Sequence, residues 1–174
     1  MDNRLDSSSF SYLTEETAAD RLHRLEIAVQ RAGEGLIRWQ AGCMELAGNV
    51  SLAGAEITLL RLIGGGRRSK SIKELARSTN RVDIPNIQYS LRKLAAAGLT
   101  RKQGAGRSGV TYDLTDEGRV LVEELNSLRD RMLMQALEGR TELAGRLQGA
   151  AEVLEELVEL YGEAAQQAET SGKG

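Results

Sequence analysis

Residues 53–118 have the sequence AGAEITLLRLIGGGRRSKSIKELARSTNRVDIPNIQYSLRKLAAAGLTRKQGAGRSGVTYDLTDEG. The pattern predicts three short helices followed by two strands around a glycine-rich turn. Within this stretch, residues 61–107 carry 12 Lys or Arg and only two acids, Glu74 and Asp83. The rest of the chain carries 11 Lys or Arg and 23 Asp or Glu, so the net charge is −2. A basic module between acidic arms is typical of a protein that contacts DNA through one lobe.

The first two helices are bounded by clear start and stop signals. We expect the first to begin at Ser51 or Gly54 and to end at the glycines 64–66. Its buried side is formed by Ile57, Leu59, Leu60 and Ile63. An extended segment at 67–70 follows. The second helix, 71–79, begins with a Ser71–Glu74 capping box and buries Ile72, Leu75 and Ala76.

The third helix has two chemically different faces. Asp83 is the expected cap, Pro85 occupies the first turn and Gly98 ends the helix. The apolar face is formed by Ile84, Ile87, Leu91 and Leu94. The opposite face carries Pro85, Asn86, Tyr89, Arg92 and Lys93. A helix that is apolar behind and polar or basic in front suits a major groove, and Asn86 is the best candidate for recognising an adenine edge.

Two strands, 99–103 and 110–114, are predicted next, joined by the glycine-rich turn 104–109. The glycines allow the turn to approach a DNA backbone closely, and Arg107 could enter a minor groove. Thr115 is the expected cap of the following helix. The candidate DNA-binding residues are Arg67, Arg68, Lys70, Ser71, Pro85, Asn86, Tyr89, Arg92, Lys93, Arg101, Lys102 and Arg107.

The flanking segments carry long helical patterns. Residues 14–50, with Thr14 as expected cap, repeat apolar positions at steps of three and four: Leu22, Leu25, Val29, Ala32, Leu36, Trp39, Cys43, Leu46 and Val50. Residues 119–168 do the same on either side of Gly139, at Leu121, Leu125, Leu128, Met132 and Ala136, and at Leu143, Leu147, Ala150, Leu154, Leu157, Tyr161 and Ala164. Such narrow apolar seams favour a homodimer built from these helices. Residues 1–13 and 169–174 are expected to be flexible ends.

Composition argues against catalysis and against a membrane segment. One cysteine, Cys43, and one histidine, His23, leave no disulfide and too few ligands for a zinc site. No nucleophilic triad can be assembled, and the glycines 64–66 lack the G-K-[ST] of a phosphate loop. We therefore expect no enzyme, no metal and no cofactor. No apolar run is long enough to cross a bilayer and no signal peptide is visible, so a soluble, cytoplasmic protein is expected.

The central residues resemble the MarR (multiple-antibiotic-resistance) family of bacterial winged-helix transcriptional regulators. The resemblance lies in the helix pair SIKELARST (71–79) and IPNIQYSLRKLAAAGL (84–99), the wing, and the closing LTDEG (114–118). It implies a mainly α, winged helix-turn-helix protein with a small β-wing, a DNA-binding lobe at 51–118 and long terminal dimerisation helices. It also implies a homodimeric repressor that binds double-stranded DNA at a pseudo-palindromic operator. Residues 85–93 would be the major-groove helix and Arg107 the wing arginine, although Ala105 stands where the family's common pattern has an aspartate.

The resemblance further implies that a small aromatic or phenolic effector could bind between the dimerisation helices and the lobe, with Tyr12 and Trp39 as candidate lining residues. From its place in the seam, Trp39 is expected to pack in the core or at the dimer contact. Cys43 is expected to be a buried hydrophobe and His23 a surface residue. The alternative function is a winged-helix module that binds protein and not DNA, which the pattern Asn86, Arg92, Lys93 fits less well.

Overall fold

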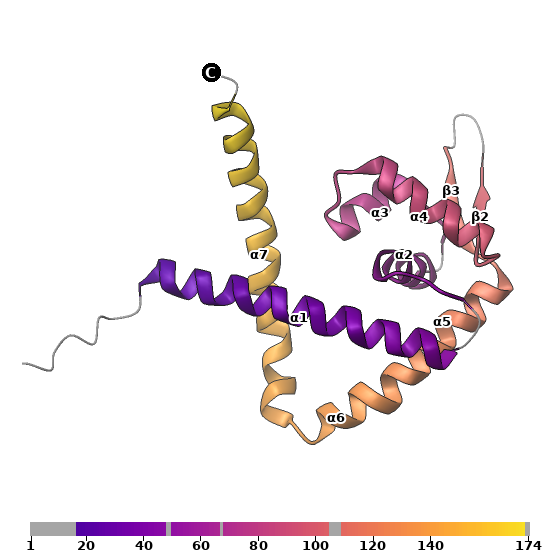
Figure 1. Cartoon of the computed structure of the whole chain (residues 1–174), viewed down its shortest axis with the longest axis horizontal. Coiled ribbons are helices and arrows are strands. Elements are labelled where there is room, and N and C mark those ends of the chain that lie inside the picture. The colour runs from indigo at the N-terminus through magenta and orange to yellow at the C-terminus, as the bar shows by residue number, and fades with distance from the viewer. Residues whose placement is uncertain (1–16, 48–49, 67, 105–108, 173–174) are drawn as a thin grey trace, which may run out of the picture. The chain divides into compact units, whose positions relative to one another are not determined.

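The computed structural model describes residues 17–47, 50–66, 68–104 and 109–172, and Figure 1 shows their helices and strands. The elements in chain order are α1 (Ala18–Ala47), α2 (Gly54–Gly64), β1 (Lys70–Ser71), α3 (Ile72–Thr79), α4 (Ile84–Ala96), β2 (Thr100–Gln103), β3 (Thr111–Leu114), α5 (Asp116–Arg129), the π-helical turn η2 (Asp130–Met134), α6 (Gln135–Glu138) and α7 (Thr141–Ser171). The mainly helical architecture with a small antiparallel sheet is confirmed. The chain divides into two compact units, residues 1–40 and 41–174.

The first unit contains most of α1, which begins later than expected. The helix starts at Ala18, and Thr17 and Asp20 cap it reciprocally. The Asp20 amide donates to Thr17 Oγ1 at 3.1 Å, and the Thr17 amide donates to Asp20 Oδ2 at 3.0 Å. An acid at the third helical position thus performs the role that a capping box requires. Thr14 and residues 1–13 lie outside the described residues. His23 is exposed, as expected.

The second unit is built around α2. The predicted buried side of this helix is confirmed, since Leu59 and Leu60 have no exposed surface and Ile57 and Ile63 are 2% exposed. The apolar face of α4 packs on it through Ile87, Leu91 and Leu94. Leu75, Leu99, Leu114, Leu125 and Leu128 complete the core. In Figure 1, α3 and α4 lie together over α2, with β2 and β3 beside them.

Local signals fix the ends of the short helices. Ser71 and Glu74 form the expected capping box, and the Asn86 amide donates to Asp83 Oδ1 at 3.1 Å, so Asp83 caps α4. The Gly118 amide donates to Thr115 Oγ1 at 3.0 Å, which confirms Thr115 as the cap of α5. After α4, Gly98 adopts φ +73°, a conformation that residues with a Cβ rarely adopt.

The sheet has three antiparallel strands in the order β1-β3-β2, one more than the two strands expected for the wing. Of the extended segment expected at 67–70, only Lys70 belongs to β1, which continues to Ser71. The strands expected at 99–103 and 110–114 each begin one residue later. The wing turn at 105–108, including Arg107, lies outside the described residues.

The C-terminal helices follow the pattern only in part. Leu121, Leu125 and Leu128 are buried in α5, but Met132, in the π-helical turn, is 50% exposed. The expected break at Gly139 separates α6 from α7. Residues 169–171, which we expected in a flexible tail, are the last turn of α7, so that prediction was wrong. None of the helices that the structure describes combines the length and apolar character needed to cross a bilayer.

Candidate nucleic-acid interface

The outer face of α4 presents polar and aromatic side chains to solvent. Pro85, Asn86, Tyr89 and Arg92 are all exposed, as the pattern predicted. They stand on a helix whose opposite face is buried and whose first turn is fixed by the Asp83 cap and Pro85. A rigid helix with an exposed, hydrogen-bonding N-terminal half is the geometry that major-groove binding requires.

Lys93 is placed differently from its neighbours on that face. Its ammonium group lies 3.3 Å from Glu56 Oε2 on α2, and its side chain is 41% exposed. The same group lies 5.9 Å from the centroid of the Tyr89 ring. The structure therefore directs Lys93 toward the neighbouring helix as well as toward the outer face.

A second polar cluster lies where β1 meets α3. Glu74 accepts a hydrogen bond from the Ser71 amide at 2.8 Å and from the Ser71 hydroxyl at 2.9 Å, and it forms an ion pair with Arg68. The pKa of Glu74 is lowered from 4.5 to about 2. The largest cause is the hydrogen bond from the Ser71 backbone amide, followed by the hydrogen bonds from Arg68 and from the Ser71 hydroxyl. Arg68 nevertheless remains 71% exposed and is available at the edge of the lobe.

This cluster predicts an acid-dependent loss of stability. Because the pKa of Glu74 is lower in the folded chain, its carboxylate stabilises the fold above the unfolded pKa, near 4.5. That contribution disappears as the pH falls from 4.5 toward about 2. We expect Glu74→Gln to flatten this part of the profile of urea midpoint against pH. Parallel profiles for Glu74→Gln and the wild type would contradict this stabilising role of the Glu74 carboxylate. Glu123→Gln is the control, because Glu123 is an exposed acid.

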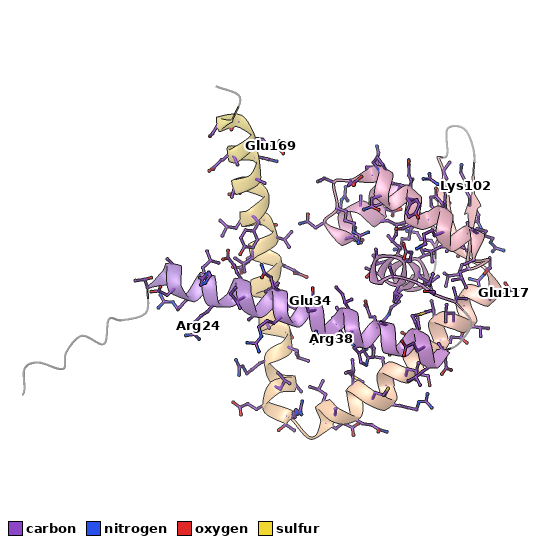
Figure 2. All side chains as sticks on the ribbon, viewed as in Figure 1. Arg24, Glu34, Arg38, Lys102, Glu117 and Glu169 are labelled. Atoms are coloured by element: carbon purple, nitrogen blue, oxygen red, sulfur yellow. The ribbon has the colours of Figure 1, made fainter. Side chains whose placement is uncertain are left out.

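Basic side chains also gather on the sheet. In the register, Tyr112 of β3 pairs with Lys70 of β1 on one side and with Lys102 of β2 on the other, so the three share one face. Lys102, labelled in Figure 2, is exposed on the strand that leads into the wing. Arg101 is also exposed, but it lies opposite Asp113 and forms an ion pair with it at 3.2 Å. Arg67 and Arg107 lie outside the described residues.

Three residues of this region were absent from the sequence predictions. Glu56 faces the core of the second unit, and its position three residues before Leu59 was the available signal. Val82, in the turn before α4, is 95% exposed, and Gln88 is exposed on the outer face of α4.

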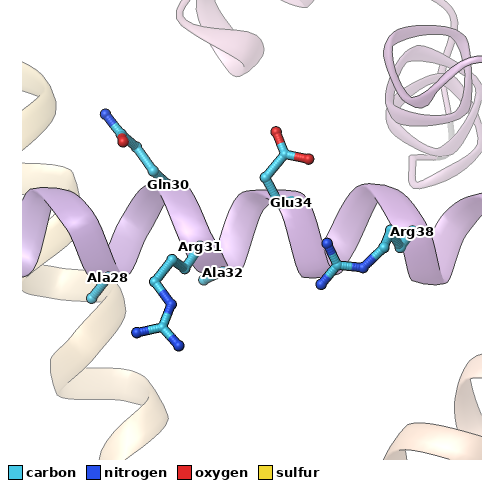
Figure 3. A pocket seen from close by; sticks show the side chains of 6 residues that line it. All are labelled: Ala28, Gln30, Arg31, Ala32, Glu34 and Arg38. Carbon is cyan, nitrogen blue, oxygen red and sulfur yellow. The ribbon is translucent and has the colours of Figure 1, made fainter.

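The proposed effector pocket is not tested by the described residues. Tyr12 lies outside them, while Trp39 is half-buried and its indole N–H has no hydrogen-bond partner among them. Figure 3 shows a hollow on α1 lined by Ala28, Gln30, Arg31, Ala32, Glu34 and Arg38. Gln30 and Glu34 leave one side of the helix and Arg31 the other, so these side chains do not converge on a ligand (Figure 3).

The single cysteine is buried, and the described residues form no cluster of metal ligands. Cys43 is 2% exposed, as expected for a buried hydrophobe. Burial raises the pKa of its thiol, an effect that Arg61 partly offsets. Among residues 17–47, 50–66, 68–104 and 109–172, no group of three or more His, Cys, Asp or Glu side chains could hold a metal ion.

Residues 52–118 match the family model of a winged helix DNA-binding domain. No curated protein matches the sequence. Among solved structures, FabT of Streptococcus pneumoniae in complex with DNA is similar at 16% identity and TM-score 0.63, over 80% of this chain and 99% of that chain. A MarR family transcription regulator is similar at 15% identity and TM-score 0.63, over 85% of this chain and 95% of that chain.

Two structures of the repressor CouR, each with a different ligand, are also similar to this chain. Its complex with a 23-mer DNA duplex has 22% identity and TM-score 0.63, over 80% of this chain and 99% of that chain. The Rhodococcus jostii protein bound to p-coumaroyl-CoA has 16% identity and TM-score 0.62, over 77% of this chain and 91% of that chain. The chain therefore has the winged-helix fold that is also found in MarR-family transcription regulators.

Proposed function

Because residues 52–118 are a winged helix DNA-binding domain in a chain with the MarR-family fold, we propose that this protein is a homodimeric, sequence-specific regulator of transcription. The observation that carries the proposal is the outer face of α4, where Asn86, Tyr89 and Arg92 are exposed over a buried apolar face. In the proposed complex α4 occupies a major groove, and Lys70, Lys102 and the wing contact the phosphates.

The terminal helices support the dimer. α7 has 31 residues and no buried residue in the single chain, and its apolar residues Leu143, Leu147 and Leu154 are each 41–47% exposed. A long helix with such an uncovered apolar seam is stabilised when a second helix covers it. We propose residues 14–50 and 119–168 as the dimerisation segments, so the two α4 helices would meet successive major-groove faces about 34–36 Å apart. Sedimentation as a monomer at micromolar concentration would contradict this arrangement.

Repression and effector response complete the proposal. A dimer bound at an operator that overlaps a promoter excludes the polymerase from it, so repression is the expected direction of regulation. An aromatic or phenolic effector would bind near Tyr12 and Trp39. Because Trp39 is the only tryptophan, its fluorescence reports directly on such binding. An unchanged emission spectrum across a panel of phenolic acids would contradict the placement of the effector.

Selection from a random duplex pool tests the proposal most directly. We expect enrichment of a pseudo-palindrome, and affinity for it should fall as salt rises, with a log-log slope of about −0.9 for each neutralised phosphate. Absence of enrichment, together with capture of one protein partner, would favour the protein-binding alternative.

Two substitutions separate base recognition from phosphate binding. Asn86→Ala should reduce the discrimination at one base pair of the selected duplex by about 1–3 kcal/mol of binding free energy, and it should leave the salt slope unchanged. Lys102→Ala should weaken binding to all duplexes alike and reduce the magnitude of the slope by about 0.9. Anisotropy titrations on selected and scrambled duplexes measure both effects. Equal losses on every duplex from both variants would contradict the assignment of roles.

A further inference from the structure

A buried carboxylate connects the scaffold of the second unit to the outer face of α4. The Glu56 side chain, in the first turn of α2, is 5% exposed. Its Oε2 accepts from the Ala53 amide at 2.7 Å, and its Oε1 accepts from the Ser90 hydroxyl at 3.2 Å. The Lys93 ammonium lies 3.3 Å from Oε2. One carboxylate thus holds two residues of α4 against the start of α2, which fixes the rotation of α4 about its axis.

The position of Lys93 follows from this carboxylate. If the ammonium moved out to a phosphate, Glu56 would be left with 5% exposure and no opposing charge, which is costly for a buried ion. The ammonium also lies 5.9 Å from the centroid of the Tyr89 ring, and Tyr89 is 54% exposed on the outer face. Lys93 therefore links the buried acid to an aromatic side chain on the exposed face of α4.

Arg92, the adjacent residue, has none of these restraints. Its side chain is exposed, and no carboxylate in the described part of the chain lies within ion-pair distance of it. The two neighbouring cations of α4 therefore differ in their environment, although the sequence presents them as equivalent.

We propose that Glu56 is a positioning residue of the DNA-binding face, and that Lys93 acts through Glu56 and Tyr89 rather than by neutralising a phosphate. The inference rests on the proposed DNA binding. An ammonium that is already paired with a protein carboxylate releases no DNA counterion, so Lys93 contributes nothing to the salt slope. Its contribution is to orient Tyr89, and hence to discriminate between sequences.

The matched variants Arg92→Gln and Lys93→Gln test the proposal in the full-length protein. Binding to the selected duplex and to a scrambled duplex is titrated at several KCl concentrations. Arg92→Gln should reduce the magnitude of the slope by about 0.9 and weaken binding to both duplexes. Lys93→Gln should keep the wild-type slope, while the preference for the selected duplex over the scrambled duplex falls by on the order of tenfold.

Glu56→Gln supplies a readout that structural damage would not produce. The amide oxygen can still accept from the Ala53 amide, and the amide NH2 can donate to the Ser90 hydroxyl at the position where Oε1 accepted from it. The negative charge is gone, however, and Lys93 is released. The slope should then become steeper by about 0.9 and the scrambled duplex should bind more tightly. Loss of packing alone would weaken binding and would not steepen its salt dependence. Thermal melting shows whether Glu56→Gln folds. If it does not fold, the comparison of Lys93→Gln with Arg92→Gln still tests the proposal.

The outcomes separate this inference from the proposed function. A wild-type protein that prefers no duplex, or whose binding ignores salt, would overturn both. A wild type that behaves as expected, with Lys93→Gln reducing the slope as much as Arg92→Gln, would overturn the inference alone. An unchanged slope in a folded Glu56→Gln variant would do the same.

Discussion

Replacing Gly118 by alanine should destabilise the second unit by about 3 kcal/mol, because the added methyl group has no space. Gly118 lies in the first turn of α5, where a Cβ would collide with the carbonyl oxygen of Leu99 and lie 3.0 Å from its carbonyl carbon. The same Leu99 oxygen accepts a hydrogen bond from the Thr115 amide at 3.1 Å. Neither backbone segment can shift without breaking the bond that joins the start of β2 to the cap of α5.

Urea unfolding followed by circular dichroism measures this loss. Val120→Ala is the matched control, because Val120 lies in the same helix and is 66% exposed. The control should change stability by less than about 0.5 kcal/mol. Equal urea midpoints for the two variants would show that the close approach of α5 to Leu99 does not constrain the fold.

Sequence reasoning succeeded where the deciding interactions are local. Ser71 with Glu74, and Asp83 with the Asn86 amide, are three residues apart, so spacing alone predicts them. The buried face of α4 follows from helical periodicity for the same reason, and the outer face with Asn86 follows with it.

The features that the sequence did not predict are contacts between residues far apart in the chain and local changes in helix type or length. Lys93 meets Glu56, which is 37 residues away, and Arg101 meets Asp113 through the strand register. No local pattern reports either pair. The π-helical turn Asp130–Met134 was not predicted either, because the apolar spacing continues through it from Leu128 to Met132. The last turn of α7 is polar but contains no helix-breaking residue before Gly172, so polarity alone did not end the helix.

Leu91→Ala should cost about 2–5 kcal/mol of folding free energy, because it leaves a cavity beneath the proposed groove-binding helix. Leu91 is 1% exposed and lies on the face of α4 opposite to Asn86 and Arg92. Its side chain is buried and is not part of the proposed DNA surface. We therefore expect a lower urea midpoint together with an unchanged salt slope for the molecules that remain folded.

Gln88→Ala, on the exposed face of the same helix, is the control and should change stability by less than about 0.5 kcal/mol. At a temperature where Leu91→Ala is half unfolded, its apparent Kd should rise about twofold, since only folded molecules bind. At a temperature where it is fully folded, its Kd should equal that of the wild type. A weaker affinity under fully folded conditions would mean that Leu91 also sets the geometry of the outer face. A stability loss below about 1 kcal/mol would contradict the close packing of α4 on α2, on which the exposure of Asn86, Tyr89 and Arg92 depends.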